Sequence, residues 1–518
     1  PRPRPPLSPV RAGASARKRD ERSASGLARR KAAAFAPRAG GSMLKFCCAL
    51  IGLLALWGPA SAQDFVRVHD DVFAIQHVQI IDGTGAPAVQ DQTVLIDHGR
   101  IAAIGRHVRL PAHVAVIDGR GKTLIPGLVG MHEHLFGWAP TRAAPIAQER
   151  FFSAPQLYLA SGVTTARTTG STDPYGDLGV KREIDAGDLI GPDLDLTTPY
   201  LDGSLPSIPQ LYPLRGAADA RDTVRFWHDR GFTSVKAYAN ITPDELQAAI
   251  EEAHRLGMKV TGHLCSVGYE QAAAMGIDNL EHGPFVAPDG DLDPQRASGM
   301  CQSPTGEGQG AIARDILPSV EPDAPALQHV IQTLVARRIP ITSTLAVVEG
   351  GSDLDLNHNP RLHALFAPEA WDLVVAAQQR ESAGPRNVLE QAMLQKEMAF
   401  ERAFVAAGGI LLVGCDPTGD GHTIAGLGDQ RNIELLVQAG FTLPQVIRFA
   451  TLNGAMFEGR DREIGSIATG KRADLVLLDG DLTHDVNVIE HPEIVFKAGV
   501  GYDSEAIYAS LAGHVGRD

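Results

Sequence analysis

Strands and helices alternate through the middle of the chain, and this pattern limits the possible folds more than any other feature. In the clearest unit, residues 234–238 predict a short strand, and Thr242-Pro243-Asp244-Glu245 is a capping box that begins a helix. Apolar residues at helical spacing continue to Gly257, and residues 258–263 predict the next strand. Such repetition is typical of parallel strands joined by right-handed crossovers. Over about 330 residues it favours a closed barrel over an open sheet.

Short predicted strands, separated by Gly, Asp and Pro turns, lie on either side of this middle region. Residues 64–125 predict an antiparallel β module, and residues 473–478 and 492–499 predict further strands. We therefore expect an α/β protein with a (β/α)8 TIM barrel at 126–458. A small composite β-sandwich domain from both chain ends, 64–125 and 459–518, would accompany it. Residues 284–330 are rich in Pro, Gly, Asp and Ser and predict a long loop over one face of the barrel.

The first 62 residues differ in composition from the rest of the chain. Residues 1–42 are rich in Pro, Arg, Ala and Ser, which predicts a disordered or non-native upstream segment, with a basic nucleic-acid arm as the alternative. Residues 43–62 resemble a signal peptide, because Lys45 precedes an apolar run and Ala60-Ser61-Ala62 is a small-residue cleavage site. An uncleaved membrane anchor is the alternative. We expect a periplasmic or secreted protein.

The charge balance restricts the partners of the mature chain. Cleavage after Ala62 would leave 35 Lys and Arg against 59 Asp and Glu, which changes the net charge from −14 to −24. So acidic a protein is a poor match for nucleic acid or for an anionic membrane. The five cysteines are too few for a disulfide scaffold. We expect a small-molecule substrate as the partner, no nucleic acid, and no membrane contact after cleavage. A homo-oligomer is compatible with the sequence.

Five predicted strands end in residues that can bind a metal ion, and in a parallel barrel such strand ends converge on the face where active sites lie. An ordinary structural role is the alternative explanation for each of these residues taken singly. Their shared position at strand ends argues that the set as a whole is not a chance arrangement. Imidazoles suit zinc, and a carboxylate can both bind a metal and accept a proton. The residues, in chain order, are His132 and His134, Lys236, His263, His282 and Asp416.

Lys236 is the unexpected member of this set, because a divalent cation repels an ammonium group. A neutral amine that has captured carbon dioxide would instead be a carbamate. Such a carboxylate could bridge two metal ions about 3.5–4 Å apart. The prediction of a two-metal centre therefore depends on Lys236.

These motifs resemble those of the amidohydrolase superfamily, and within it the imidazolonepropionase and prolidase-like (Xaa-Pro dipeptidase-like) branch. The matching stretches are 124–134, 162–167, 235–236, 262–263, 280–282, 414–416 and 464–478. The resemblance implies two divalent ions, with Zn²⁺ favoured, bridged by carbamylated Lys236. The implied ligands are His132 and His134 for one ion and His263 and His282 for the other, with Asp416 beside the bridging hydroxide.

The chain departs from the family pattern at two positions. Thr168 follows Arg167 where the family often has Asp, and Cys415 precedes Asp416 where the family often has Thr. Neither departure removes a ligand. Strand alternation points Cys415 away from the Asp416 side, which predicts a buried structural cysteine.

The predicted reaction is metal-dependent hydrolysis of an amide or peptide bond in a small substrate, such as a dipeptide, an N-acyl amino acid or an aromatic amide of the ochratoxin type. Asp416 would transfer the proton, and His263 or Tyr238 would stabilise the oxyanion. Tyr238 and His422 are predicted to contact substrate, with a barrel-filling aromatic and an exposed loop histidine as the alternatives. A lactonase or cyclic-amide hydrolase is the second hypothesis. A non-catalytic scaffold is disfavoured, because all six ligand positions are occupied.

Overall fold

The computed structural model describes most of the chain after residue 61. The described residues are 62–138, 147–206, 208–283, 320–350, 359–382, 386–418 and 423–517. The predicted tail and all but the last residue of the predicted signal peptide therefore lie outside them. The chain divides into two units, 1–59 and 60–518, and all described residues belong to the second. Among them, no helix is both long and apolar enough to cross a membrane.

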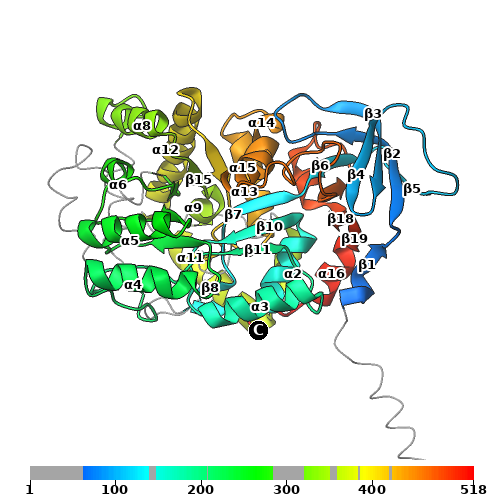
Figure 1. The fold of residues 1–518 in the computed structure, drawn as a ribbon. Helices are drawn as coiled ribbons and strands as arrows, with labels where there is room; N and C mark the ends of the chain where they lie inside the picture. Colours follow the sequence, from blue (N-terminus) through cyan, green and yellow to red (C-terminus); the bar gives the residue numbers. More distant parts are fainter. Residues whose placement is uncertain are drawn as a thin grey trace, which may run out of the picture. The chain divides into compact units, whose positions relative to one another are not determined.

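A nine-stranded sheet combines strands from both ends of the described chain (Figure 1). The C-terminal strand β17 pairs with the N-terminal strand β6, and β1 pairs with β19. Apolar side chains from both ends fill its core, where the rings of Phe73 and Phe496 stack 5.3 Å apart. The strands are β1 (Val66–Val68), β2 (Val72–Ile80), β3 (Val89–Asp97), β4 (Arg100–Gly105), β5 (Ala115–Asp118), β6 (Thr123–Pro126), β17 (Leu475–Leu478), β18 (Pro492–Lys497) and β19 (Val500–Asp503).

The expectation of a purely antiparallel N-terminal module is wrong in one respect. Both β5 and β6 pair with β2 in parallel, whereas β3 and β4 continue it as antiparallel neighbours. The physical reason is the length of β2. Its residues 73–76 pair with β5, and its residues 79–80 pair with β6 along the same edge. Strand composition alone does not distinguish these pairings.

The middle of the chain contains two parallel sheets. One has the order β11-β10-β7 and the other β12-β13-β14-β15-β16. Parallel bridges from Thr197 to Ser234 and from Leu201 to Ala237 join the first sheet to β12. At the opposite edge, the backbone N–H of Asp416 donates to the carbonyl of His132 at 2.9 Å, just beyond β16. The strands are β7 (Leu128–Glu133), β10 (Val163–Thr168), β11 (Asp193–Leu196), β12 (Ser234–Ala237), β13 (Lys259–Gly262), β14 (Asn279–Glu281), β15 (Ile341–Ser343) and β16 (Leu411–Val413).

Helices connect these strands, and Figure 1 shows α4, α5, α6 and α8 flanking one side of them. A short hairpin, β8 (Phe136–Trp138) with β9 (Ala147–Glu149), follows β7. The helices are α2 (Ser153–Ala160), α3 (Pro174–Ala186), α4 (Ala217–His228), α5 (Pro243–Arg255), α6 (Tyr269–Met275), α8 (Pro325–Arg337), α9 (Leu345–Gly350), α10 (Pro360–Leu365), α11 (Pro368–Ser382), α12 (Arg386–Ala406), α13 (Leu427–Gln438), α14 (Leu443–Arg448), α15 (Gly454–Phe457) and α16 (Ser504–Ser510), with a π-helical turn at Phe449–Asn453.

Local sequence signals explain where several helices begin. The predicted capping box at the start of α5 is confirmed, because the Thr242 hydroxyl and the Glu245 carboxylate exchange hydrogen bonds with each other's backbone N–H. The predicted loop at 284–330 is wrong at its end, since α8 begins at Pro325. Proline suits a first helical position, and the apolar residues Leu327, Val330 and Leu334 bury one face of α8. Residues 284–319 of that loop lie outside the described residues.

Two glutamates on α12, Glu397 and Glu401, are buried one helical turn apart. Their side chains are almost completely buried, with 1% and 0% of their surfaces exposed. Burial raises the pKa of Glu401 to about 8, although the Ser343 hydroxyl opposes the shift. The folded protein therefore keeps a proton that the unfolded chain releases near pH 4–5. The free energy of unfolding should then fall as pH rises toward 8.

We compare the free energy of unfolding of Glu401→Gln with that of the wild type. This difference should favour the variant more at pH 8 than at pH 5, by on the order of 1–3 kcal/mol, because glutamine cannot ionise. Denaturant unfolding at both pH values measures the difference. Glu183→Gln, at an exposed position on α3, is the control and should show no such change. If Glu401→Gln and the wild type differed in free energy of unfolding by the same amount at both pH values, the raised pKa of Glu401 would be contradicted.

Candidate metal centre

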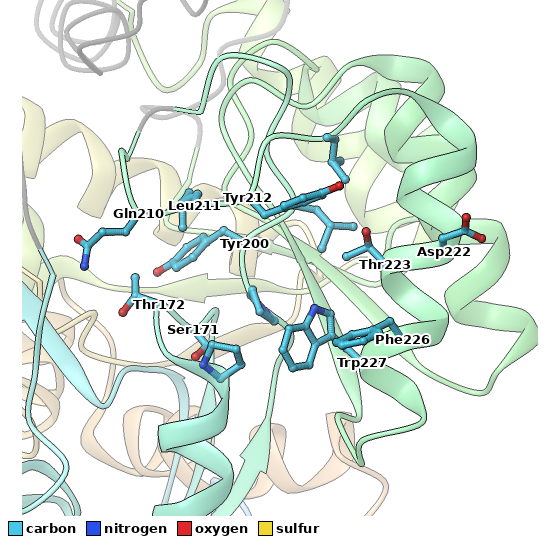
Figure 2. A pocket seen from close by; sticks show the side chains of 14 residues that line it. Ser171, Thr172, Tyr200, Gln210, Leu211, Tyr212, Asp222, Thr223, Phe226 and Trp227 are labelled. Carbon is cyan, nitrogen blue, oxygen red and sulfur yellow. The ribbon is translucent and has the colours of Figure 1, made fainter. Parts of the chain in front are cut away.

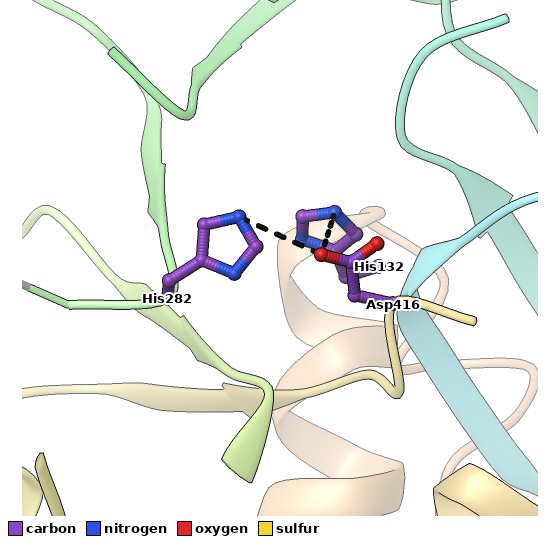
Figure 3. Close-up of side chains that lie close together, drawn as sticks. All are labelled: His132, His282 and Asp416. Carbon is purple, nitrogen blue, oxygen red and sulfur yellow. Dashed lines mark ion pairs between the residues drawn. The ribbon is translucent and has the colours of Figure 1, made fainter. Parts of the chain in front are cut away.

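Three side chains from separate parts of the sequence converge at one end of the parallel strands (Figure 3). Ligand atoms of His132, His282 and Asp416 all lie within 4.8 Å of one another, and the three residues are buried. The Nε2 atoms of His132 and His282 each lie 3.8 Å from Oδ2 of Asp416. His132 belongs to β7, whereas His282 and Asp416 follow β14 and β16. Converging strand ends therefore bring together residues up to 284 positions apart.

Two further predicted ligands extend this group. Nε2 of His134 lies 3.3 Å from Oδ1 of Asp416. On the other side, Nδ1 of His263 lies 2.8 Å from Nε2 of His282. The four histidines and Asp416 thus form one continuous cluster, with Asp416 facing the histidines of β7 and also His282.

Hydrogen bonds to Nδ1 fix how three of these imidazoles are presented. Nδ1 of His132 donates to Oε2 of Glu281 at 2.8 Å, and Nδ1 of His134 donates to the Gly170 carbonyl at 3.2 Å. Nδ1 of His282 lies 2.7 Å from the Thr344 hydroxyl. For His132 and His134, Nε2 is thereby left to face Asp416 with its lone pair. This is the arrangement that metal-binding histidines require.

Burial keeps the imidazoles of His132 and His282 neutral, as metal ligation also requires. Burial, together with the charge of Lys236, lowers the pKa of His132 to about 4, although Glu281 and Asp416 oppose this shift. Burial and the adjacent His263 lower the pKa of His282 well below its usual range. Both rings are therefore unprotonated at neutral pH and can donate a lone pair.

Lys236 lies on β12 and is completely buried. Among the described residues, its Nζ has no hydrogen-bond partner, which is costly for an ammonium group. Burial lowers the pKa of the Lys236 amine to about 8, against the opposing effect of the Glu281 and Asp416 carboxylates. An unsatisfied amine with a lowered pKa fits a lysine that is modified or that faces a metal-bound partner better than it fits a free ammonium group.

The backbone is constrained where the cluster forms. His282 and Asp416 have positive φ values of 69° and 48°, a conformation that non-glycine residues seldom adopt. Gly414 allows this close approach, because a Cβ atom there would lie 2.3 Å from the backbone N of His132. The Thr418 hydroxyl donates to Oδ1 of Asp416 at 2.8 Å and holds the carboxylate. Strain of this kind is found at sites whose geometry is imposed by the surrounding structure.

Sequence reasoning missed two buried residues that support the cluster. Glu281 accepts from His132 and also from Nη2 of Arg167, which lies 3.0 Å from its Oε1. The Arg167 guanidinium also donates to the Met131 carbonyl at 2.6 Å, next to His132. The position of Glu281 directly before His282 was the only sequence signal of its role. Its contacts with His132 and Arg167 could not be inferred from spacing.

Glu281→Gln should weaken metal binding by about 10–100-fold, because an amide cannot hold the His132 tautomer as a carboxylate does. The measurement is competition with a chromophoric chelator at pH 7.5. Glu251→Gln, on the exposed side of α5, is the matched control and should bind metal as the wild type does. Unchanged metal affinity in Glu281→Gln would mean that Glu281 has a purely structural role.

Aromatic residues border the cluster. The ring of Tyr238, a predicted substrate contact, lies 4.9 Å from that of His263, on the side predicted from its position two residues after Lys236. Tyr200 was not predicted, yet its hydroxyl lies 3.3 Å from Nε2 of His134. Its only sequence signal was its place after β11. The remaining predicted contact, His422, lies outside the described residues.

Glu133, the last residue of β7, and Cys415, two residues after β16, contact each other. Cys415 is a free, buried cysteine whose thiol donates to Oε2 of Glu133 at 3.0 Å. Burial and the neighbouring Asp429 carboxylate raise the pKa of both groups well above their usual values. The thiol therefore stays protonated. This placement agrees with the predicted structural role for Cys415.

The sequence matches a known protein family and segments of several known proteins. The sequence model of the amidohydrolase family matches residues 123–500. An imidazolonepropionase from Idiomarina loihiensis is 41% identical over 100 residues, which are 19% of this chain and 24% of that protein. The match thus spans about a quarter of that relative's length.

Solved structures resemble the fold over most of the chain. A Xaa-Pro dipeptidase with bound methionine aligns with a TM-score of 0.63 at 19% identity, covering 83% of this chain and 100% of that one. The A. niger ochratoxinase aligns with a TM-score of 0.57 at 18% identity, covering 83% of this chain and 95% of that one. At these identities, the similarity shows a common fold.

Proposed function

Because the chain belongs to the amidohydrolase family, we propose that it is a metal-dependent hydrolase that cleaves the amide or peptide bond of a small substrate. One observation carries the proposal. The Nε2 atoms of His132 and His282 and the carboxylate of Asp416 converge in a buried cluster with all three ligand atoms within 4.8 Å. Structural support alone does not require three such groups at the ends of β7, β14 and β16.

We propose that this site holds two divalent metal ions. His132 and His134 would hold one ion and His263 and His282 the other, with Zn²⁺ the favoured metal for an imidazole-rich site. Lys236, as a carbamate, would supply the carboxylate shared between them, and its unsatisfied Nζ supports this role. When bound, the ions would polarise the substrate carbonyl and lower the pKa of water.

The chain's own residues would move the proton and stabilise charge. Although burial alone would raise the Asp416 pKa, the facing imidazoles of His132, His134 and His282 lower it well below its usual range, so the carboxylate is ionised and can accept a proton. It would then pass that proton to the leaving nitrogen. Burial raises the pKa of Tyr238, so its hydroxyl remains a donor that can stabilise an oxyanion, as can His263.

We propose a dipeptide, an N-acyl amino acid or an aromatic amide as the substrate, with His422 as a further contact. The similarity in fold to a Xaa-Pro dipeptidase and to an ochratoxinase supports this range. We also propose that the parallel strands form a (β/α)8 barrel over 126–458, beside a composite β-sandwich of 64–125 and 459–518.

We propose that the mature protein acts in the periplasm or outside the cell, after removal of residues 43–62. Cys265 is disulfide-bonded, and its partner lies outside the described residues. Disulfides persist mainly in oxidising compartments, which supports export. The acidic mature surface supports a small-molecule substrate rather than nucleic acid or anionic membrane.

A substrate panel tests the proposed activity. The purified protein, stripped with a chelator and reloaded with Zn²⁺, is assayed on dipeptides, N-acyl amino acids, aromatic amides and lactones. We expect turnover of at least one amide class, and only after metal is restored. Turnover of lactones alone would show that the amide assignment is wrong. No bound metal after reloading would contradict a metal-dependent hydrolase of any kind.

A further inference from the structure

A largely apolar cavity of about 490 Å³ lies beside the metal cluster (Figure 2). Its walls include Trp227 and Phe226 from α4, Leu211 and Leu214 from the loop after β11, and Tyr200. The polar residues of its lining, apart from tyrosines, are Ser171, Thr172, Gln210, Asp222 and Thr223. A cavity of this size and composition is typical of a binding site for a small apolar group.

The cavity is formed at the strand ends that also build the metal cluster. Ser171 and Thr172 follow β10, and Tyr200 follows β11. Tyr200 is shared between the two sites, because its ring lines the cavity while its hydroxyl lies 3.3 Å from Nε2 of His134. Figure 2 shows this hydroxyl directed away from Trp227 and Phe226. One aromatic ring therefore separates the apolar space from a predicted metal ligand.

Large apolar side chains are also exposed around this cavity. Tyr212 and Phe226 line it with 46% and 41% of their surfaces exposed. Tyr175 is 59% exposed, and its ring lies 5.6 Å from that of Trp227 in the cavity wall. Because exposed aromatic surface is unfavourable in water, its concentration at one opening points to a ligand that covers it.

We propose that this cavity binds a bulky apolar or aromatic substituent of the substrate while the scissile amide bond lies at the metal cluster, with Tyr200 positioned between the two. The inference rests on the proposed hydrolase function and makes it more specific. The substrate class is then an amide or dipeptide with a large apolar side group, not one with small or charged groups on both sides. Phe226, Trp227 and Tyr212 determine this preference.

The test compares pairs of substrates that differ only in a ring: N-benzoyl-alanine against N-acetyl-alanine, and the dipeptide Phe-Ala against Ala-Ala. We expect the wild type to favour the aromatic member of at least one pair by about tenfold or more in kcat/KM. Phe226→Ala, and Thr223→Trp, which fills the cavity from α4, should reduce this ratio toward one. Val116→Ala, at an exposed position on β5, is the control and should leave the ratio unchanged.

Direct binding separates failure of this inference from failure of the proposed function. Calorimetric titration of the wild type and Thr223→Trp with N-benzoyl-alanine and N-acetyl-alanine, using metal-free protein, does not depend on turnover. Tighter binding of the benzoyl compound, lost in Thr223→Trp, would support the cavity assignment even if no amide is hydrolysed. An aromatic preference that survives both variants, or no preference in turnover and binding, would overturn it. Thermal melts check that both variants fold.

Discussion

Asp416→Asn is expected to lower kcat on an amide substrate by about 10²–10⁴-fold, the range typical of a lost general acid–base. The asparagine side chain has nearly the same shape but cannot accept the proton that Asp416 takes up. The carboxylate lies 3.3 Å from His134 and 3.8 Å from both His132 and His282, so no other described carboxylate is placed to replace it in the cluster. Steady-state kinetics with Zn²⁺ restored measures the effect.

Metal content and a matched variant make this result interpretable. Asp416→Asn should keep most of its bound metal, because the four histidines remain, and so lose far more activity than metal. Asp372→Asn, at an exposed position on α11, should keep wild-type kcat and metal. If Asp416→Asn hydrolysed amides at the wild-type rate, Asp416 would not be the proton-transfer group.

Lys236→Ala is expected to lose metal from the centre and to reduce kcat by about 10²-fold or more, because it removes the carboxylate that we propose both ions share. Lys236 is fully buried on β12, so alanine leaves a cavity where its side chain lay. A short carboxylic acid, such as acetate or propionate, should enter that space and restore part of the activity in a concentration-dependent way. Metal analysis and activity assays across a titration of the acid measure both effects.

Restored activity in the presence of the acid would show that Lys236→Ala lacks a carboxylate. A variant with a generally damaged fold would not respond to the acid. Lys181→Ala, which removes a surface lysine 3.1 Å from Asp185 on α3, should neither lose activity nor respond to the acid. An inactive Lys236→Ala with wild-type metal content and no rescue would contradict the carbamate. Retained activity in that variant would rule out any role for Lys236 in the centre.

Local signals in the sequence predicted the regular elements of the middle region well. The capping box before α5 is a short-range feature, and that helix begins where it was expected. The parallel pairing of β5 and β6 with β2 was not predicted, because neighbouring strands are selected by packing across the sheet. The beginning of α8 at Pro325 was missed, because the Pro-rich stretch before it resembles a loop.

Part of the candidate site could be predicted because its residues lie at the ends of predicted strands. His132, His134, Lys236, His263, His282 and Asp416 all occupy strand ends, and the topology brings strand ends together. Glu281 and Tyr200 also lie at or after strand ends, but their position does not reveal which histidines they contact. Their roles depend on contacts with His132 and His134 over more than 60 residues of sequence, which only the folded chain provides.

The shared sheet of the two chain ends has a consequence for how the protein reaches its folded state. β6 continues through Gly127 into β7, and the Gly127 N–H donates to the carbonyl of Asp474 at 2.8 Å. The strand that carries His132 is therefore anchored by residues synthesised almost 350 positions later. Contacts of such sequence separation form slowly and late. During synthesis, the metal-binding pair should stay incompletely ordered until the C-terminal strands emerge, so premature termination before β17 should yield chains without a functional centre.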